Sequence, residues 1–394
     1  MTTRTKQRYF GAPILSNGKL PIGGRTKNKM LTSIQFPFLN WFGRMPENSR
    51  LAPIVSRISR KWLGSYIYSL KLEINNACQL NCEMCYIPKG HMELPMNQID
   101  SLFNQIKNCG VRIEILGGEP LLRKDVHLIV EKAKQEAHSP FVSIYTNGML
   151  ATPEVCESLK KAGLDAAIVT LISKEKAVHD VFTKCRGSWE KTVNGIKNFK
   201  NAGIETYTFT AVHNRNINLI KEIYQFVKEE LHSKPLFYQY IPVRKDDPLC
   251  ISQNDWYEIK SWILNQTSEH SAFVRDFYML TGNACSGGNF VLTVKVDGSV
   301  QPCPFISNLE IGNISDTDIW TIYKNRFDSS GLKSFKILPD ECRSCTYASV
   351  CGGGCRAGND KLFGSYSNKD FRCKGPFLTD ISKQKVMENT PCFF

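Results

Sequence analysis

Apolar and polar residues alternate from about residue 66 onward in a pattern that predicts short strands separated by longer amphipathic stretches. The predicted strands are Tyr66–Ile74, Arg112–Leu116, Phe141–Thr146, Ala166–Leu171, Thr206–Val212 and Leu236–Ile241. Between them, the spacing of apolar residues predicts helices near residues 97–109, 124–137, 153–162, 188–202 and 217–231. Repeated strand–helix units build a parallel sheet. The pattern therefore predicts an α/β fold with a partial (β/α)6, TIM-like barrel.

Three cysteines directly follow the first predicted strand. Cys78, Cys82 and Cys85 have C-x3-C-x2-C spacing, and in barrels of this kind the chemistry gathers at the C-terminal ends of the strands. A structural zinc site uses four closed ligands, whereas a [4Fe–4S] cluster held by three thiolates leaves one iron open to a substrate or cofactor. We therefore expect such a cluster here, with zinc or incidental cysteines as the alternative.

The next two strands end in polar, glycine-containing segments. The second ends in Gly117-Gly118-Glu119-Pro120, where glycines allow close backbone approach to a ligand and Glu119 or nearby carbonyls can accept from an ammonium group. The third ends in Thr146-Asn147-Gly148. A simple tight turn explains this segment, and the alternative, that it lines the same pocket, is what the family resemblance described below implies.

A second group of cysteines occupies the C-terminal third of the chain. Residues Phe290–Pro302, with an Asp297-Gly298 turn, predict a hairpin that brings Cys285 and Cys303 near each other. A zinc ribbon is the alternative for the C-x2-C pair. The complete set is Cys285, Cys303, Cys342, Cys345, Cys351, Cys355 and Cys373.

Composition narrows the functional classes. The chain has 394 residues, 42% of them hydrophobic, which is enough for a large core and excludes disorder as the default. We find no secretory signal, so fifteen cysteines indicate metal or redox chemistry in a reducing cytoplasm. The longest uncharged apolar run, Met30–Gly43, is too short to cross a bilayer.

The net charge of +13 is concentrated at the N-terminus. Residues 1–64 hold twelve basic side chains and one acid, interleaved with aromatics such as Trp41. One interpretation is an irregular arm with solvated charges. The others are docking of an acidic electron donor (flavodoxin-like or ferredoxin-like), an acidic peptide or an anionic membrane surface. No motif indicates nucleic acid.

Together, the three-cysteine loop and the glycine-rich strand end resemble the radical SAM superfamily, whose open iron binds S-adenosylmethionine (SAM). The resemblance implies a catalytic role for Cys78, Cys82 and Cys85. The sequence departs from the family pattern at one position, because it has Ile172 where relatives often have an acidic residue. The resemblance implies that SAM is bound by Tyr86, Gly117, Gly118, Glu119, Pro120, Asn147, Thr170 and Arg186; a surface ion pair is the alternative for Arg186.

The seven C-terminal cysteines resemble the SPASM domain, a cysteine-rich α+β extension that carries auxiliary clusters. The resemblance assigns Cys285, Cys303 and Cys355 to one [4Fe–4S] cluster and the other four to a second, giving three clusters in all. The first auxiliary cluster lacks an obvious fourth ligand, so its iron is open or is closed by Cys250. The implied domains are an arm (1–65), the barrel (66–250), a bridging region (251–284), the auxiliary-cluster domain (285–380) and a tail (381–394).

The shared chemistry of this family is reductive cleavage of SAM to a 5′-deoxyadenosyl radical, which abstracts a substrate hydrogen. SPASM relatives most often modify ribosomally made peptides or proteins by crosslinking, epimerisation or oxidation, so we expect a peptide maturase. The alternatives are a small-molecule enzyme such as one for tetrapyrrole side-chain oxidation or decarboxylation, a sulfatase maturase, and a non-catalytic iron–sulfur carrier or sensor.

Residues for handling the substrate are less well defined by the sequence. Tyr238, Tyr240, Asp246 and Asp247 flank the sixth strand, where solvated loop acids are the simpler interpretation of the two aspartates. Two of the remaining cysteines, Cys185 and Cys250, are possible hydrogen donors but are expected to be buried and inert. Cys109 and Cys156 fall within predicted helices, and Cys392 lies in the tail.

Overall fold

The computed structural model describes residues 67–266, 285, 287–288, 291–345 and 353–375. Within these residues one sheet has the strand order β6-β5-β4-β3-β2-β1-β7-β8-β9. The barrel strands are parallel: β1 (Ser69–Glu73), β2 (Arg112–Leu116), β3 (Val142–Thr146), β4 (Ala166–Thr170), β5 (Glu205–Val212) and β6 (Lys234–Gln239). The predicted arm, the tail with Cys392, and Cys351 lie outside the described residues.

The C-terminal strands extend the same sheet. β7 (Val291–Val294) pairs in parallel with β1, and β8 (Ser299–Gln301) and β9 (Gly312–Asn313) follow antiparallel. The predicted hairpin is therefore present as β7 and β8. Its parallel pairing with the first barrel strand was not predicted, and it makes barrel and C-terminal residues one continuous sheet.

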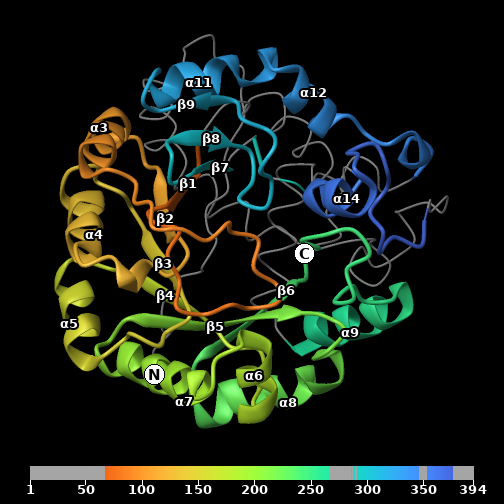
Figure 1. The fold of residues 1–394 in the computed structure, drawn as a ribbon, viewed down its shortest axis with the longest axis horizontal. Helices are drawn as coiled ribbons and strands as arrows, with labels where there is room; N and C mark the ends of the chain where they lie inside the picture. The colour runs from red at the N-terminus through yellow and green to blue at the C-terminus, as the bar shows by residue number, and fades with distance from the viewer. Residues whose placement is uncertain (1–66, 267–284, 286, 289–290, 346–352, 376–394) are drawn as a thin grey trace, which may run out of the picture.

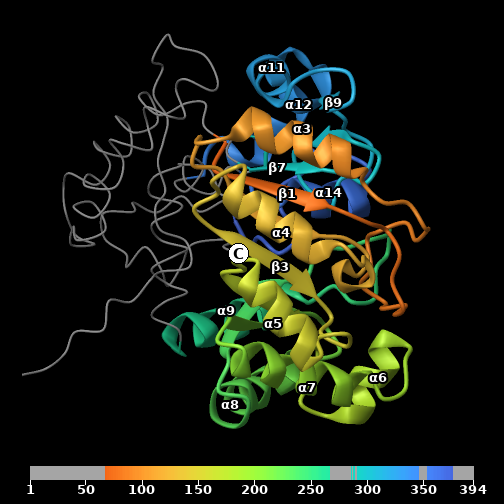
Figure 2. The ribbon, with the colours of Figure 1, turned by 90° about the vertical axis from the view of Figure 1, so that its left-hand side faces the viewer.

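Helices cover the outer side of the barrel strands, where they form an arc (Figure 1). In the view turned by 90°, α4 and α5 lie on the near side of the sheet beside β1 and β3, with α3 above them and α7 below (Figure 2). The barrel helices are α3 (Met96–Ile106), α4 (Val126–Gln135), α5 (Pro153–Lys161), α6 (Lys176–Thr183), α7 (Ser188–Asn201) and α8 (Ile220–Gln225), which continues as a π-helical turn, Phe226–Glu230. After β6 follow α9 (Gln253–Gln266), α11 (Ile319–Asn325), α12 (Ser330–Lys336) and α14 (Arg356–Phe363).

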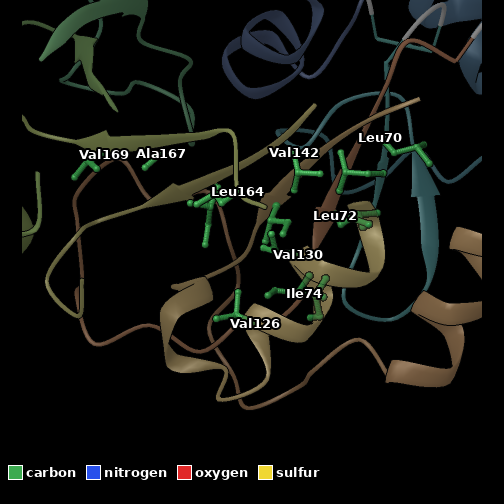
Figure 3. Packing of buried hydrophobic residues seen from close by; sticks show 14 of the residues in the cluster. Leu70, Leu72, Ile74, Val126, Val130, Val142, Leu164, Ala167 and Val169 are labelled. Atoms are coloured by element: carbon green, nitrogen blue, oxygen red, sulfur yellow. The ribbon is translucent and has the colours of Figure 1, made fainter. Parts of the chain in front are cut away.

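The hydrophobic core lies between the strands and these helices. Outward-facing Leu70, Leu72 and Val142 pack against Val126 and Val130 of α4 and their neighbours (Figure 3). All five have at most 6% of their surface exposed. Full burial of such a side chain contributes about 1.5–3 kcal/mol, so alternation along the strands fixes which face each strand turns to the helices.

The inward positions of β1 are polar, unlike the branched aliphatic layers that usually fill a closed barrel. Ser69, Lys71 and Glu73 alternate with the core leucines. The Lys71 Nζ lies 2.6 Å from Glu114 Oε2, and these side chains keep 21% and 19% of their surface exposed. Solvent therefore reaches this part of the barrel interior, as a substrate chamber requires.

The predicted fold class is confirmed, and each barrel strand begins within three residues of its predicted start. Several elements had no predicted counterpart, among them β9, α11, α12 and α14 in the C-terminal part. The same holds for α6, which follows β4, and for α9, which occupies the first part of the predicted bridging region. The last predicted strand is shifted, because pairing with β5 begins at Lys234 rather than at Leu236.

Candidate functional site

The loop that leaves β1 carries Cys78, Cys82 and Cys85, and all three side chains are half-buried. The C-terminal end of α6 holds this loop. The N–H of Asn81 donates to the carbonyl of Thr183 at 3.1 Å, and the N–H of Glu83 donates to the carbonyl of Phe182 at 3.2 Å. The helix that the sequence did not predict therefore positions the cysteines.

The thiols of Cys78 and Cys85 interact electrostatically with the thiol of Cys82. Burial raises the pKa of the Cys82 thiol to about 12, and Cys85 and Cys78 add to the rise. Iron binding would reverse this, because a ligating thiol is deprotonated. The donor set fits a [4Fe–4S] cluster with each thiolate on a different iron. In the described part of the chain, no three His, Cys, Asp or Glu side chains are grouped to hold a single metal ion.

The glycine pair after β2 packs directly on the start of the cysteine loop. A Cβ on Gly117 would lie 2.2 Å from Asn75 Oδ1, and one on Gly118 would lie 2.2 Å from the carbonyl oxygen of Ala77. Gly118 N–H donates to the Asn75 carbonyl at 2.9 Å, and Glu119 N–H donates to the Ala77 carbonyl at 2.7 Å. The close backbone approach thus serves the cysteine loop itself, immediately before Cys78.

The Glu119 carboxylate is fully buried and bonded within the protein. It accepts from Thr146 Oγ1 at 2.6 Å, from Asn147 N–H at 2.8 Å and from Leu121 N–H at 3.0 Å. Burial raises its pKa, while these donors oppose the rise. The carboxylate therefore ties the glycine-rich segment, with buried Pro120 next to it, to the turn after β3. Its predicted contact with the SAM ammonium stays a prediction.

The turn after β3 also reaches the cysteine loop. Asn147 Oδ1 accepts from Gln79 Nε2 at 3.2 Å, and Asn147 Nδ2 lies 3.9 Å from Cys78 Sγ. Gly148 has φ +76°, the left-handed region that favours glycine. The structure thus brings together three of the predicted segments: residues 75–86, 117–120 and 146–148.

The predicted residues after β4 are spread more widely. Thr170 ends β4 and is half-buried, while Arg186 is exposed on the connection between α6 and α7. Ile172 is fully buried and packs with Phe182 and Tyr240 against Cys82 and Met84. An acid at this buried position would lose its hydration, whereas isoleucine fits the apolar cluster without that cost.

Tyr86 points toward the C-terminal cysteines. Its half-buried ring lies 4.4 Å, centroid to centroid, from the ring of Phe305, two residues after Cys303. Burial raises its pKa well above the ordinary value, and nearby Glu73, Cys303 and Cys85 add to the rise. The predicted contact of Tyr86 with SAM stays a prediction.

The structure groups Cys285, Cys303 and Cys355. All three pack on one apolar cluster that includes Leu332 and Phe335. Burial raises the pKa of Cys303 to about 12, with Cys285 and Cys355 as the next causes. Cys342 and Cys345 share a turn in which the Cys345 N–H donates to the Cys342 carbonyl, and Cys373 is buried.

Cys250 shares two charged neighbours, Arg372 and Asp370, with Cys355. Its pKa is raised to about 11 by burial, and the charged groups that act on it are Asp247, Arg372 and Asp370. Its assignment as a fourth ligand stays a prediction. Cys109 and Cys156 are buried within the hydrophobic core, and Cys185 is half-buried next to Arg186.

The two aspartates near β6 differ. Asp246 is exposed, whereas Asp247 is buried and accepts from Tyr240 Oη at 2.7 Å, Val243 N–H at 3.0 Å and Leu249 N–H at 3.1 Å. The interpretation of Asp247 as a solvated loop acid is therefore wrong, because it organises the segment after β6. Tyr238 is 38% exposed on the strand before it.

Two buried charged pairs were missed by the sequence reasoning. Lys295 Nζ lies 2.6 Å from Glu73 Oε1, and Arg372 Nη2 lies 2.7 Å from Asp370 Oδ2. Asp370 Oδ2 also accepts from the N–H of Cys355 at 2.7 Å. Their positions in the sequence could have indicated both pairs. Glu73 shares the inward side of a core strand with Lys71, and Arg372 directly precedes the predicted ligand Cys373.

Two family models match the chain. The radical SAM superfamily model covers residues 72–227, and the SPASM model, an iron–sulfur cluster-binding domain, covers residues 285–346. Similar curated proteins include the AdoMet-dependent heme synthase of Methanosarcina barkeri, 27% identical over 76% of this chain and 94% of the relative. That of Nitratidesulfovibrio vulgaris is 24% identical over 81% of this chain and 93% of the relative.

Solved structures share the fold. SuiB from Streptococcus suis bound to S-adenosylmethionine has a TM-score of 0.63 at 18% identity, covering 79% of this chain and 78% of SuiB. The AdoMet-bound anSMEcpe structure has a TM-score of 0.62 at 18% identity, covering 77% of this chain and 94% of that one. In the described residues, every helix is too short or too polar to cross a membrane.

Proposed function

Since the chain belongs to the radical SAM superfamily and carries a SPASM iron–sulfur cluster-binding domain, we propose that this enzyme abstracts a hydrogen atom from a substrate held inside the barrel. The main support is that two sets of cysteines lie on adjoining loops, with Cys78, Cys82 and Cys85 on one loop and Cys303 on the other. The two loops contact each other through the rings of Tyr86 and Phe305. The barrel interior beside them is polar and solvent-accessible at Lys71 and Glu114.

Cys78, Cys82 and Cys85 would hold a [4Fe–4S] cluster, which when bound and reduced would supply the electron for cleavage of SAM into methionine and a 5′-deoxyadenosyl radical that takes a substrate hydrogen. The chain's own residues hold the parts in place. Backbone hydrogen bonds from Gly118 and Glu119 fix the residues immediately before Cys78. The buried Glu119 carboxylate fixes the turn after β3 against the same loop.

For the substrate we infer a ribosomally made peptide or protein. The support is the strongly basic N-terminal segment, with twelve basic residues and one acid in positions 1–64, which suits an acidic leader sequence. The use of SPASM enzymes in peptide maturation points the same way. An acidic flavodoxin-like or ferredoxin-like donor is the proposed source of electrons, and the cytoplasm is the proposed compartment.

A second candidate is a small molecule, namely a tetrapyrrole with carboxylated side chains. It is favoured by the curated relatives named AdoMet-dependent heme synthase, which match over 93–94% of their own length. Under this candidate, the radical takes a hydrogen from the side-chain carbon adjacent to the one that bears the carboxylate. Loss of carbon dioxide and transfer of one electron to an oxidised auxiliary cluster would then leave a carbon–carbon double bond.

Deuterium transfer separates the two candidates. Reconstituted, reduced enzyme is incubated with SAM and either a peptide extract from cells grown in deuterated medium or a side-chain-deuterated tetrapyrrole. Deuterium in 5′-deoxyadenosine from the peptide extract alone supports the first candidate, and from the tetrapyrrole alone the second. The control is the Cys82→Ser variant, which should transfer none. If wild-type enzyme transfers no deuterium in either mixture, neither substrate proposal holds.

A further inference from the structure

Lys295 connects the two cysteine-bearing loops. Its Nζ donates to Glu73 Oε1 at 2.6 Å and to the carbonyl of Pro304 at 3.3 Å. The same Nζ lies 5.7 Å from the centroid of the Tyr86 ring. Glu73 ends the strand that leads into the first loop, and Pro304 directly follows Cys303. One ammonium group therefore contacts groups from both loops.

Both charges of the pair are withdrawn from water. The Glu73 side chain is 2% exposed and the Lys295 side chain 13%. Each buried ion carries a desolvation penalty of several kcal/mol, and apolar residues of similar volume often stabilise such a site as well or better. Stability alone is therefore a weak reason for placing a charged pair here.

A purely structural interpretation is that the pair fastens the hairpin to the barrel. That connection already exists, because β1 and β7 pair in parallel from Ser69 with Val291 to Leu72 with Val294. The pair lies beyond the last paired residues, toward the cysteine loops. The additional contacts of the ammonium, to the Pro304 carbonyl and the Tyr86 ring, belong to those loops and not to the ladder.

We propose that Lys295 is a positioning residue that fixes the two cluster loops relative to each other and places a positive charge at their junction. The proposal rests on the proposed function, since it requires clusters at both loops. A positive charge in a low-dielectric interior stabilises the reduced, more negative state of a nearby cluster. Because the Lys295 ammonium, and not the Glu73 carboxylate, contacts the Pro304 carbonyl next to Cys303, the pair presents its positive end to that loop. Lys295 therefore makes the reduction potential of the cluster on Cys285, Cys303 and Cys355 more positive, in addition to Lys336, whose Nζ donates to the carbonyl of Cys285 at 3.1 Å.

The test is an EPR-monitored potentiometric titration of the reconstituted, full-length enzyme. Lys295→Met should shift the midpoint potential of this auxiliary cluster to a more negative value, and Lys295→Arg, which keeps the charge, should restore it. The double variant Lys295→Met, Glu73→Gln avoids leaving an unpaired buried carboxylate. It should give a smaller shift in the same direction, so the test does not depend on the single variant folding.

The control is Lys234→Met. Lys234 on β6 pairs with Glu205 on β5 at the same 2.6 Å distance, but this pair is more exposed and lies at the β6 edge of the sheet, away from β7. It should leave the cluster potentials unchanged. If the Lys295 variants unfold at lower temperature but keep wild-type potentials, Lys295 is only structural and the proposal is overturned. Failure of the proposed function is distinct, because then wild-type enzyme with three clusters would not cleave SAM.

Discussion

Replacing Gly118 with alanine should displace the cysteine loop. The new Cβ would lie 2.2 Å from the carbonyl oxygen of Ala77 and 2.6 Å from its carbonyl carbon. Both atoms are backbone, so no side-chain rotation can relieve the overlap. Ala77 immediately precedes Cys78, and its carbonyl accepts the hydrogen bond from Glu119 N–H at 2.7 Å.

The size of the effect follows from two contributions. Overpacking a dense interior costs about 1–3 kcal/mol, and breaking the hydrogen bond to the Ala77 carbonyl costs about 1 kcal/mol more. A total of about 2–4 kcal/mol is a large part of the roughly 5–15 kcal/mol by which folded domains are stable. Because relief requires movement next to Cys78, we expect Gly118→Ala to lose one cluster of three, or roughly four of twelve irons.

The assay is iron and sulfide content after anaerobic reconstitution, with thermal unfolding of the same samples. The control is Gly203→Ala after α7, where φ is +69° and the nearest atom to a new Cβ is Lys160 Nζ at 3.9 Å. The left-handed conformation costs an alanine about 1–2 kcal/mol, so this variant should lose stability but keep its iron. Full iron content and SAM cleavage in Gly118→Ala would refute the reasoning.

Three further predictions concern groups around the site. Thr146→Val removes a donor to buried Glu119 and should lower the free energy of unfolding by about 1–3 kcal/mol in urea titrations; unchanged stability would contradict the anchoring role. Burial favours the neutral form of Asp370, but Arg372 and backbone N–H groups hold its pKa below the ordinary 3.8. Its stabilisation should be present above pH 3.8 and be lost as the pH falls through the folded pKa, whereas Asp370→Asn should be less stable at neutral pH and lack that acid-dependent loss. Cys250→Ala should retain roughly twelve irons, and loss of iron from an auxiliary cluster would identify Cys250 as a ligand.

The barrel could be predicted because its signals are local. Alternation in segments such as Arg112–Leu116 and helical periodicity in residues 153–162 reflect burial of one face, which the sequence records directly. Asp297-Gly298 likewise marks the turn between β7 and β8. The parallel pairing of β7 with β1 joins residues more than two hundred positions apart, and local patterns carry no information about such a partner.

The sequence indicated which residues form the candidate site better than it indicated how their side chains and backbone are arranged. The spacing of Cys78, Cys82 and Cys85 predicts the first ligand set, and the Gly117-Gly118 pair was interpreted as making room for a ligand. In the structure it makes room for the backbone of residues 75–77. The Glu119 carboxylate accepts from protein donors, which the sequence did not indicate, and its contact with SAM stays a prediction. Such roles depend on which backbone passes nearby, and spacing does not encode that.

The most direct test of the central claim combines iron content with SAM cleavage. Anaerobically reconstituted enzyme should hold roughly twelve irons per chain if three [4Fe–4S] clusters form, and with a strong reductant it should convert SAM to 5′-deoxyadenosine and methionine. The triple variant Cys78→Ala, Cys82→Ala, Cys85→Ala should hold roughly eight irons and leave SAM intact. Zinc in place of iron, or equal SAM cleavage by the triple variant and the wild-type enzyme, would contradict the account.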